Sequence, residues 1–317
     1  MKILFWGTPE FAVPSLRALL GEGHELVAAV TQPDRPAGRG RLIRPSPVKR
    51  VALDDGIPVL QPERARTDAF LAAVRELAPE LSIVVAYGQI LRREVLDVPP
   101  LGSINVHASL LPELRGAAPI NHAILAGHEV TGITIMRMVE VMDAGPILHQ
   151  VSEPIGEQET ATELAARLSE IGAEALIEAL AMIELGAAEP QPQDDSLATF
   201  APRLNRETAH VDWTGDAAAV ARHLRAMDEL PGAWATWQEQ ELKLFRPAVA
   251  EPHDAHGARG EAGTVLRVTP TDPAYGALIA CGEGGVWVRE VKPQGKRRMT
   301  TAEWLRGRGF APGDRLG

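Results

Sequence analysis

The chain has 317 residues, of which 45% are hydrophobic and only 4% aromatic, and its formal net charge at pH 7 is −10. This length predicts about two domains, and the acidic balance argues against a protein that binds nucleic acid or anionic membrane without specificity. The only cysteine, Cys281, excludes an internal disulfide and a thiolate metal cluster. The N-terminal apolar run ends at Gly7, too early for a signal peptide, and no stretch is long enough to cross a membrane. We therefore expect a soluble, cytoplasmic protein.

Strand and helix patterns alternate in the first half of the chain. Runs of apolar and β-branched residues predict strands at residues 3–6, 26–31, 58–60, 81–86, 104–107 and 133–138. Helical spacing of apolar residues predicts helices at residues 14–20, 70–77, 120–125 and 161–185. This alternation favours a Rossmann-like open α/β sheet with mostly parallel strands. A Pro-rich, acidic stretch at residues 188–195 indicates a linker.

The pattern changes after this linker. A predicted helix at residues 217–227 is followed by short strands at residues 234–237, 242–245, 265–268, 278–280 and 286–291. Gly and Pro separate these runs, which is typical of a small antiparallel barrel or sandwich, and an OB-like barrel is one option. We predict a first domain at residues 1–187, a linker at 188–204 and a second domain at 205–317.

The most informative polar residues lie at the end of one predicted strand. Asn105 and His107 are two residues apart, so their side chains share a face of the strand, near the edge where open α/β sheets bind ligands. Asp143 follows the strand at 133–138. We expect the two loops to leave the sheet at the same edge, so that the carboxylate can orient the imidazole. The structural alternatives are a hydrogen-bonded Asn–His pair and a turn aspartate before Gly145.

This set combines an amide donor, an imidazole and a carboxylate, but it contains no nucleophile. Ser109 lies nearby without a Gly-x-Ser-x-Gly elbow, which argues against a serine hydrolase. The sequence has no His-Glu-x-x-His motif, and no Gly-x-Gly-x-x-Gly or Walker loop follows the first strand. We therefore expect no metal. The set is suited to direct attack of an external nucleophile on an activated acyl group.

These residues and their neighbours resemble the folate-dependent formyltransferases. The resemblance is carried by Asn105, His107, Asp143 and residues 109–112 and 115–119. A narrower likeness to the methionyl-tRNA formyltransferases of that family is carried by residues 7–11, 31–40, 45–49, 84–88, 201–205, 212–213 and 292–299. It covers nearly the whole chain, including a C-terminal half that smaller formyltransferases lack.

The resemblance implies a reaction and a donor. The formyl group of 10-formyltetrahydrofolate would pass to the amino group of methionine on initiator methionyl-tRNA, for the initiation of protein synthesis. The segments that resemble folate-contacting ones are Ser109, Leu110, Leu111 and Pro112, and the loop Ala86, Tyr87 and Gly88. The alternative is that the leucines and Pro112 are ordinary turn and core residues.

The resemblance also suggests a mechanism. Our hypothesis is that the Asn105 amide and the His107 imidazolium donate hydrogen bonds to the developing oxyanion. His107 would also move the proton from the attacking amine to the departing folate nitrogen. Asp143 would hold His107 and could bind the water that relays the proton.

Two groups of basic residues are candidates for binding RNA. Residues 35–50 contain no acidic side chain, and their Gly and Pro content predicts a mobile loop rather than a helix. A second group lies in the C-terminal domain. The candidate tRNA-binding residues are Arg35, Arg39, Arg41, Lys49, Lys296, Arg297 and Arg298. The alternative is that an arginine-rich composition produces such groups by chance.

Other functions use a similar polar set. A formyltransferase acting on an amino sugar and a formyl-folate hydrolase remain alternatives, although the second domain and the basic groups favour tRNA. A catalytically silent RNA-binding module is a further alternative, against which the intact set of Asn105, His107 and Asp143 argues. The segment Met227 to Gly232 departs from the sequence expected of the family, which puts the C-terminal surface in doubt. We expect a monomer.

Overall fold

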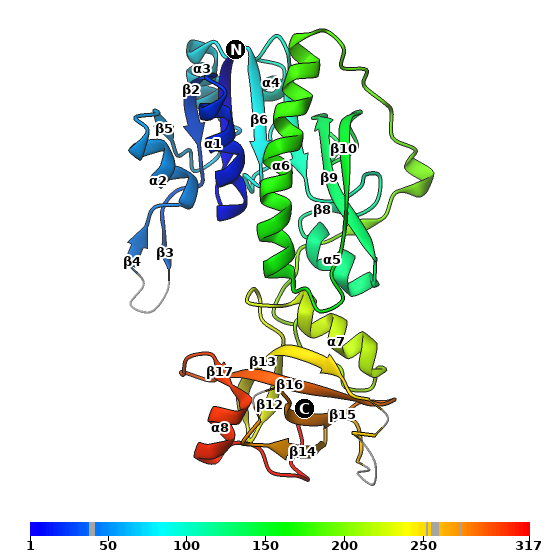
Figure 1. Ribbon diagram of the computed structural model, residues 1–317. Helices are drawn as coiled ribbons and strands as arrows, with labels where there is room; N and C mark the ends of the chain where they lie inside the picture. Colours follow the sequence, from blue (N-terminus) through cyan, green and yellow to red (C-terminus); the bar gives the residue numbers. More distant parts are fainter. Residues whose placement is uncertain (38–41, 252, 255–259, 273) are drawn as a thin grey trace. The chain divides into compact units, whose positions relative to one another are not determined.

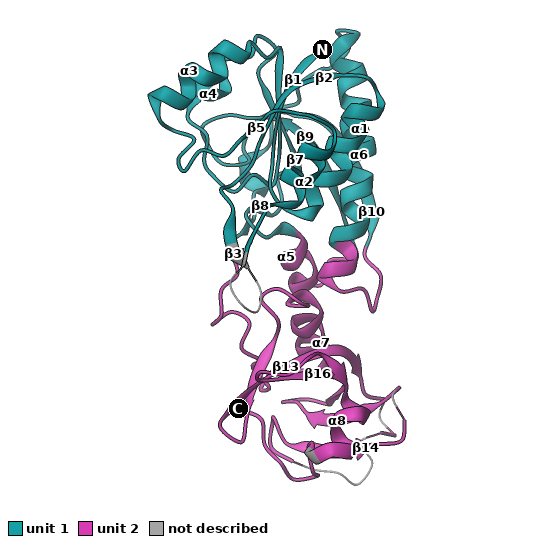
Figure 2. Cartoon of the chain, turned by 90° about the vertical axis from the view of Figure 1, so that its left-hand side faces the viewer, with its two compact units in different colours: residues 1–119, 130–154, 165–201 teal, residues 120–129, 155–164, 202–317 magenta. Residues whose placement is uncertain are grey.

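The structure is a computed structural model that describes all residues except 38–41, 252, 255–259 and 273 (Figure 1). The chain divides into two compact units that alternate along the sequence (Figure 2). Unit 1 comprises Met1–Pro119, Val130–Pro154 and Ala165–Ala201, and unit 2 comprises Ile120–Glu129, Ile155–Leu164 and Pro202–Gly317. None of the helices formed by the described residues is long and apolar enough to span a membrane.

Unit 1 is built on a seven-stranded sheet with the order β10-β9-β7-β6-β1-β2-β5. Its strands are β1 (Lys2–Gly7), β2 (Glu25–Val30), β5 (Val59–Leu60), β6 (Leu81–Val85), β7 (Ser103–His107), β9 (Val130–Arg137) and β10 (Ile147–Pro154). The first five of these pair in parallel, whereas β9 is antiparallel to β7 and β10 to β9. The predicted mostly parallel α/β sheet is thus confirmed.

Helices cover both faces of this sheet. They are α1 (Val13–Gly21), α2 (Pro47–Asp54), α3 (Asp68–Leu77), α4 (Arg93–Leu96) and most of α6 (Ala161–Glu184), with 3₁₀ turns at Glu10–Ala12 and Asp195–Leu197. Helix α5 (Pro119–Ala126) belongs almost entirely to unit 2. Figures 1 and 2 place α3 and α4 on the face opposite α1 and α6. Every residue of β6 is buried, as expected for a strand covered on both sides.

Two short ladders lie outside the main sheet. Strand β3 (Arg35–Ala37) pairs with β4 (Leu42–Arg44), and β8 (Arg115–Gly116) pairs with β11 (Phe200–Ala201). The prediction that residues 35–50 form a loop rather than a helix is wrong at their C-terminal end, because α2 begins at Pro47. Proline is well tolerated at the first helical position, and the Ser46 hydroxyl caps the helix by accepting a hydrogen bond from the Lys49 N–H.

Unit 2 contains a six-stranded antiparallel sheet with the order β12-β13-β16-β15-β14, and β17 pairs with β16. Its elements are α7 (Ala217–Ala226), β12 (Trp234–Trp237), β13 (Gln240–Val249), β14 (Val265–Thr269), β15 (Gly276–Ala280), β16 (Gly285–Pro293), β17 (Met299–Thr300) and α8 (Thr301–Arg308). The last residues of the chain join the two outer strands. Gly317 exchanges backbone hydrogen bonds with Thr236 of β12, and the Val265 N–H of β14 donates to the Asp314 carbonyl. The sheet thus closes into the small OB-like barrel predicted as one option.

Candidate active site

His107 is the last residue of β7 and is only 5% exposed. Its Nε2 lies 3.0 Å from the Leu114 carbonyl oxygen, which can only accept a hydrogen bond, so Nε2 carries the proton in the neutral ring. The other ring nitrogen, Nδ1, lies 3.7 Å from the Asp143 carboxylate. The structure thus brings together the predicted imidazole and carboxylate, with the unprotonated nitrogen of a neutral ring facing the acid.

Asp143 reaches His107 by an unexpected route. Because β9 is antiparallel to β7, the loop after β9 leaves the sheet at the edge where β7 begins, so the expectation that both loops leave at the same edge is wrong. At the contact, Asp143 has a left-handed φ of 53°, which Asp and Asn tolerate better than most side chains. Its Oδ2 also accepts a hydrogen bond from the Gly116 N–H at 2.8 Å, which fixes the carboxylate.

Gln193 holds the backbone around Asp143. Its Nε2 donates to the carbonyls of Asp143 and Gly145 at 2.8 and 2.7 Å. Its Oε1 accepts two hydrogen bonds from the buried guanidinium of Arg115. Sequence reasoning missed this residue, because it lies in the stretch interpreted as a linker and no pattern distinguishes it from the neighbouring polar residues.

The electrostatic surroundings favour a neutral His107. Burial lowers the pKa of the imidazole below its ordinary value, while the nearby Asp143 carboxylate and the hydrogen bond to Leu114 oppose the shift without cancelling it. A neutral imidazole that faces a carboxylate can take up a proton and is then stabilised as a cation. In the resting site His107 is therefore equipped to act first as a base.

Asn105 lies on the same strand, two residues before His107, and is only partly buried. No hydrogen bond joins its side-chain amide to another described residue, whereas both nitrogens of His107 face protein groups. An amide donor with unsatisfied hydrogen-bonding capacity at the end of a sheet can bind an oxygen of a ligand.

Thr134 fixes the conformation of the 109–112 segment. Its hydroxyl donates to the Ser109 carbonyl at 2.6 Å and accepts from the Leu111 N–H at 3.1 Å. Pro112 follows a cis peptide bond and is partly exposed, whereas Leu111 is 3% exposed, and the Leu110 side chain lies over Gly132. This segment presents Leu110 and Pro112 to its surroundings and keeps Leu111 in the core.

In the 86–88 segment, two of the three residues are exposed to solvent. Ala86 and Gly88 are exposed, but the Tyr87 side chain is 2% exposed and packs edge-on against Trp6 at 5.3 Å between ring centroids. Burial raises the pKa of its phenol to about 12. The Tyr87 carbonyl accepts hydrogen bonds from Thr8 and Gln32, so this residue supports the loop from within the core.

The four basic candidates of unit 1 differ in their surroundings. Arg35 is exposed on β3. The Lys49 ammonium lies 2.6 Å from the Asp34 carboxylate and 2.6 Å from the Gln61 side-chain oxygen, so its charge is compensated within the protein. Arg39 and Arg41 lie outside the described residues.

The three basic candidates of unit 2 also differ. Lys296 and Arg297 are exposed. The Arg298 guanidinium binds three carboxylates, those of Glu290 at 2.6 Å and of Asp228 and Glu229 at 3.2 Å each, and it stacks 4.0 Å from the centre of the Phe245 ring. Its surroundings are those of a structural ion-pair network.

Apart from the undescribed residues, the structure contains no group of three or more His, Cys, Asp or Glu side chains arranged to hold a metal ion. Within the site, His107 and Asp143 are two potential ligands, and the other groups bonded to these residues are backbone groups and the amide of Gln193.

Known proteins match both units. Residues 1–180 match the family model described as formyl transferase, and residues 203–309 match the one described as formyl transferase, C-terminal domain. Methionyl-tRNA formyltransferases from Geobacter sulfurreducens and Pelobacter propionicus are 45% and 47% identical to this chain over all 317 residues, which span 97% and 96% of their own lengths.

A solved structure has a similar fold. HypX from Aquifex aeolicus, in complex with tetrahydrofolic acid, superposes with a TM-score of 0.67 at 21% identity, over 98% of this chain and 49% of that one. The chain belongs to the formyl transferase family. Within that family it resembles the two methionyl-tRNA formyltransferases along its whole length.

Proposed function

We propose that this enzyme transfers the formyl group of 10-formyltetrahydrofolate to the amino group of methionine on initiator methionyl-tRNA, for the initiation of protein synthesis. The observation that carries the proposal is the contact of His107 with Asp143, beside Asn105, in a chain that belongs to the formyl transferase family. The full-length likeness to methionyl-tRNA formyltransferases supports the choice of acceptor. We further propose that the enzyme acts as a monomer in the cytoplasm.

In the proposed mechanism, the neutral amine of methionine attacks the formyl carbon. A carbon–nitrogen bond forms, the formyl oxygen becomes negative and the attacking nitrogen becomes positive. The Asn105 amide donates a hydrogen bond to that oxygen and stabilises it. Loss of one such donor typically lowers kcat about 10²–10³-fold.

His107 then moves one proton. Its neutral ring takes the proton from the positive nitrogen of the adduct, and Asp143 stabilises the resulting imidazolium at 3.7 Å. The imidazolium gives the proton to the departing folate nitrogen as the old carbon–nitrogen bond breaks and the carbonyl re-forms. The products are formylated methionyl-tRNA and tetrahydrofolate, and His107 returns to its neutral form.

Residues that flank this site are proposed to bind the donor. The segment from Ser109 to Pro112 presents Leu110 and Pro112, and the loop of residues 86–88 presents Ala86 and Gly88. Thr134 and Gln193 are positioning residues, because each fixes backbone next to a proposed contact rather than contacting the reacting atoms.

Basic residues of both units are proposed to bind the tRNA backbone. They are Arg35, Arg39 and Arg41 in unit 1 and Lys296 and Arg297 in unit 2. Lys49 and Arg298 are weaker candidates, because carboxylates already compensate their charges. The net charge of −10 disfavours indiscriminate binding elsewhere on the surface.

The proposal is tested by offering the purified enzyme 10-formyltetrahydrofolate with initiator methionyl-tRNA and a free amino sugar as parallel acceptors. We expect formylated methionyl-tRNA at a rate that falls steeply with added salt. Formylation of the sugar, or release of formate with the tRNA unchanged, would refute the proposed acceptor.

Two variants test the assigned roles. Asn105→Asp keeps the size of the side chain but removes the donor, and we expect kcat to fall about 10²–10³-fold. Arg39→Ala is expected to raise the apparent KM for methionyl-tRNA while leaving the KM for the folate unchanged. An equal rise in both KM values would contradict the RNA role of Arg39.

A further inference from the structure

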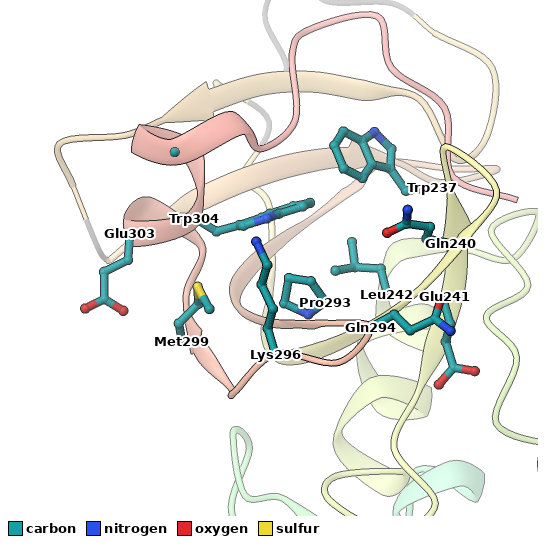
Figure 3. Close-up of a pocket in the computed structure, with 11 residues that line it drawn as sticks. Trp237, Gln240, Glu241, Leu242, Pro293, Gln294, Lys296, Met299, Glu303 and Trp304 are labelled. Atoms are coloured by element: carbon teal, nitrogen blue, oxygen red, sulfur yellow. The ribbon is translucent and has the colours of Figure 1, made fainter.

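The barrel of unit 2 carries a cavity of about 400 Å³ that takes no part in the chemistry described above (Figure 3). Its lining comes from β12, β13, the end of β16, β17 and α8 and from the segment that follows β16. The main wall residues are Trp237, Leu242, Pro293, Lys296, Met299 and Trp304. Five of the eleven lining residues are apolar or aromatic and five are polar or charged. A cavity of this size accommodates a flat heterocycle with its attached sugar.

Two indole rings form a rigid wall of the cavity. Trp237 and Trp304 meet edge to face, with 5.0 Å between ring centroids and 77° between ring planes, and both also pack against Phe310. The Trp237 indole N–H donates to the Asp314 carboxylate at 3.0 Å, which fixes its orientation. The Trp304 indole N–H donates to none of the described residues, so it can serve a bound molecule.

Among the described residues that line the cavity, Lys296 is the one with a cationic side chain. Of the two carboxylates in the lining, Glu241 pairs with Arg206, whereas Glu303 accepts the Thr300 N–H in the capping box of α8 and forms no ion pair with a described residue. No ion pair or side-chain hydrogen bond joins Lys296 to any residue that the structure describes. In Figure 3 its ammonium group projects beside Trp304. An anionic group bound at the mouth of the cavity could form an ion pair with the Lys296 ammonium group.

A fixed aromatic wall next to a free ammonium group matches the chemistry of a single-stranded nucleotide. Proteins that bind unpaired nucleotides place bases on aromatic side chains and backbone phosphates on cations, and barrels of this kind often do so. The amides of Gln240 and Gln294 also line the cavity and can both donate to and accept from a base edge.

We propose that this cavity binds one unstacked nucleotide of the RNA substrate, with its base against Trp237 and Trp304 and its phosphate at Lys296. The inference rests on the proposed function and deepens it, because it adds a nucleotide subsite to the C-terminal unit. It requires no base of particular identity, since every base presents a flat face for stacking.

The test uses the full-length enzyme labelled with ¹⁵N at tryptophan. The chain has six tryptophans, so six indole N–H signals are expected, and Trp237→Phe and Trp304→Phe assign the two of interest. Nucleoside 5′-monophosphates are titrated in, with ribose 5-phosphate as the probe that lacks a base. We expect saturable shifts of the Trp237 and Trp304 signals with the nucleotides, while the signal of Trp6, in the core of unit 1, stays unchanged.

Matched lysine variants test the phosphate contact. Lys296→Ala should weaken nucleotide binding about tenfold, whereas Lys292→Ala, which removes an exposed charge that does not line the cavity, should leave it within about twofold. Equal shifts with ribose 5-phosphate would overturn the proposal, as would equal effects of the two lysine variants. An apolar peptide that shifts the same signals while nucleotides do not would overturn it in favour of a protein partner.

Formyl transfer measured on the same preparation separates the two proposals. If methionyl-tRNA is formylated but nucleotides leave Trp237 and Trp304 unchanged, the cavity assignment fails and the proposed function stands. If nucleotides bind in the cavity but methionyl-tRNA is not formylated, the proposed function fails and the nucleotide subsite stands.

Discussion

Replacing Asp143 by Asn tests the central contact of the site with little structural disturbance. Asn has the same shape, tolerates the left-handed φ of 53° and can still accept the hydrogen bond from the Gly116 N–H. What it removes is the negative charge 3.7 Å from His107 Nδ1, an attraction of about 4.5 kcal/mol at an effective dielectric constant of ~20 and about 1 kcal/mol at ~80. If that attraction stabilises the imidazolium only during the reaction, kcat/KM falls roughly 6-fold to roughly 2,000-fold.

The assay is single-turnover formyl transfer to methionyl-tRNA, measured across pH. Burial lowers the pKa of His107, so the acid limb of the wild-type profile should lie below the ordinary histidine value of ~6.5. The Asp143 carboxylate raises that pKa, so removing its charge lowers the pKa further. The acid limb of Asp143→Asn should therefore move to lower pH, even as the rate at the plateau falls.

The control is Asp97→Asn, which removes an exposed carboxylate paired with Arg93 on the surface. It should leave both the rate and the acid limb unchanged, because exposed ion pairs contribute little. Turnover of Asp143→Asn within about twofold of wild type, with an unmoved acid limb, would refute the reasoning. A shift of the acid limb to higher pH would refute the assignment of His107 as a base that Asp143 stabilises.

Three further predictions concern stability. Gly116→Ala should lower the free energy of unfolding by about 1–3 kcal/mol in urea titrations, because φ is 128° and a Cβ would meet the Ala201 carbonyl oxygen at 2.6 Å. The pKa of His107 is lower in the folded protein than in the unfolded chain, so the unfolded chain is the first to bind a proton at this residue as pH falls. The free energy of unfolding should therefore decline as pH falls below about 6.5, and it should decline less in His107→Gln. Arg298→Ala should lower the free energy of unfolding of unit 2 by about 2–4 kcal/mol, while Arg297→Ala leaves it unchanged.

The fold was predictable where local pattern and burial agree. Buried runs such as β1 and β6 contain almost only apolar residues, so their strands were found to within a residue or two. Strand β10 was missed, because it lies at the edge of the sheet and carries Gln150, Ser152 and Glu153. An edge strand with alternating burial and few apolar residues is hard to distinguish from a loop by sequence alone.

The site was predictable only in part, for a topological reason. Spacing placed Asn105 and His107 on one face of a strand, but the direction of β9 depends on pairing that no local pattern records. The contact between Asp143 and His107 was therefore predicted for the wrong reason, because β9 runs antiparallel to β7. It forms because the loop after β9 brings Asp143 back to the end of β7. The role of Gln193 was not predictable, because its partners are backbone carbonyls about 50 residues earlier in the chain.

Arg298 connects two features that the sequence presents separately, the basic group of the C-terminal domain and the altered segment from Met227 to Gly232. Its guanidinium binds Asp228 and Glu229 of that segment, and Asp228 is only 6% exposed. If this pairing is the main role of Arg298, the effects of Arg298→Ala and Asp228→Asn on stability should be non-additive by at least about 1 kcal/mol in a double-mutant cycle. If the two effects are additive, and if Arg298→Ala lowers the affinity for tRNA while Asp228→Asn does not, then Arg298 is part of the RNA-binding surface. The altered segment would then have no structural explanation.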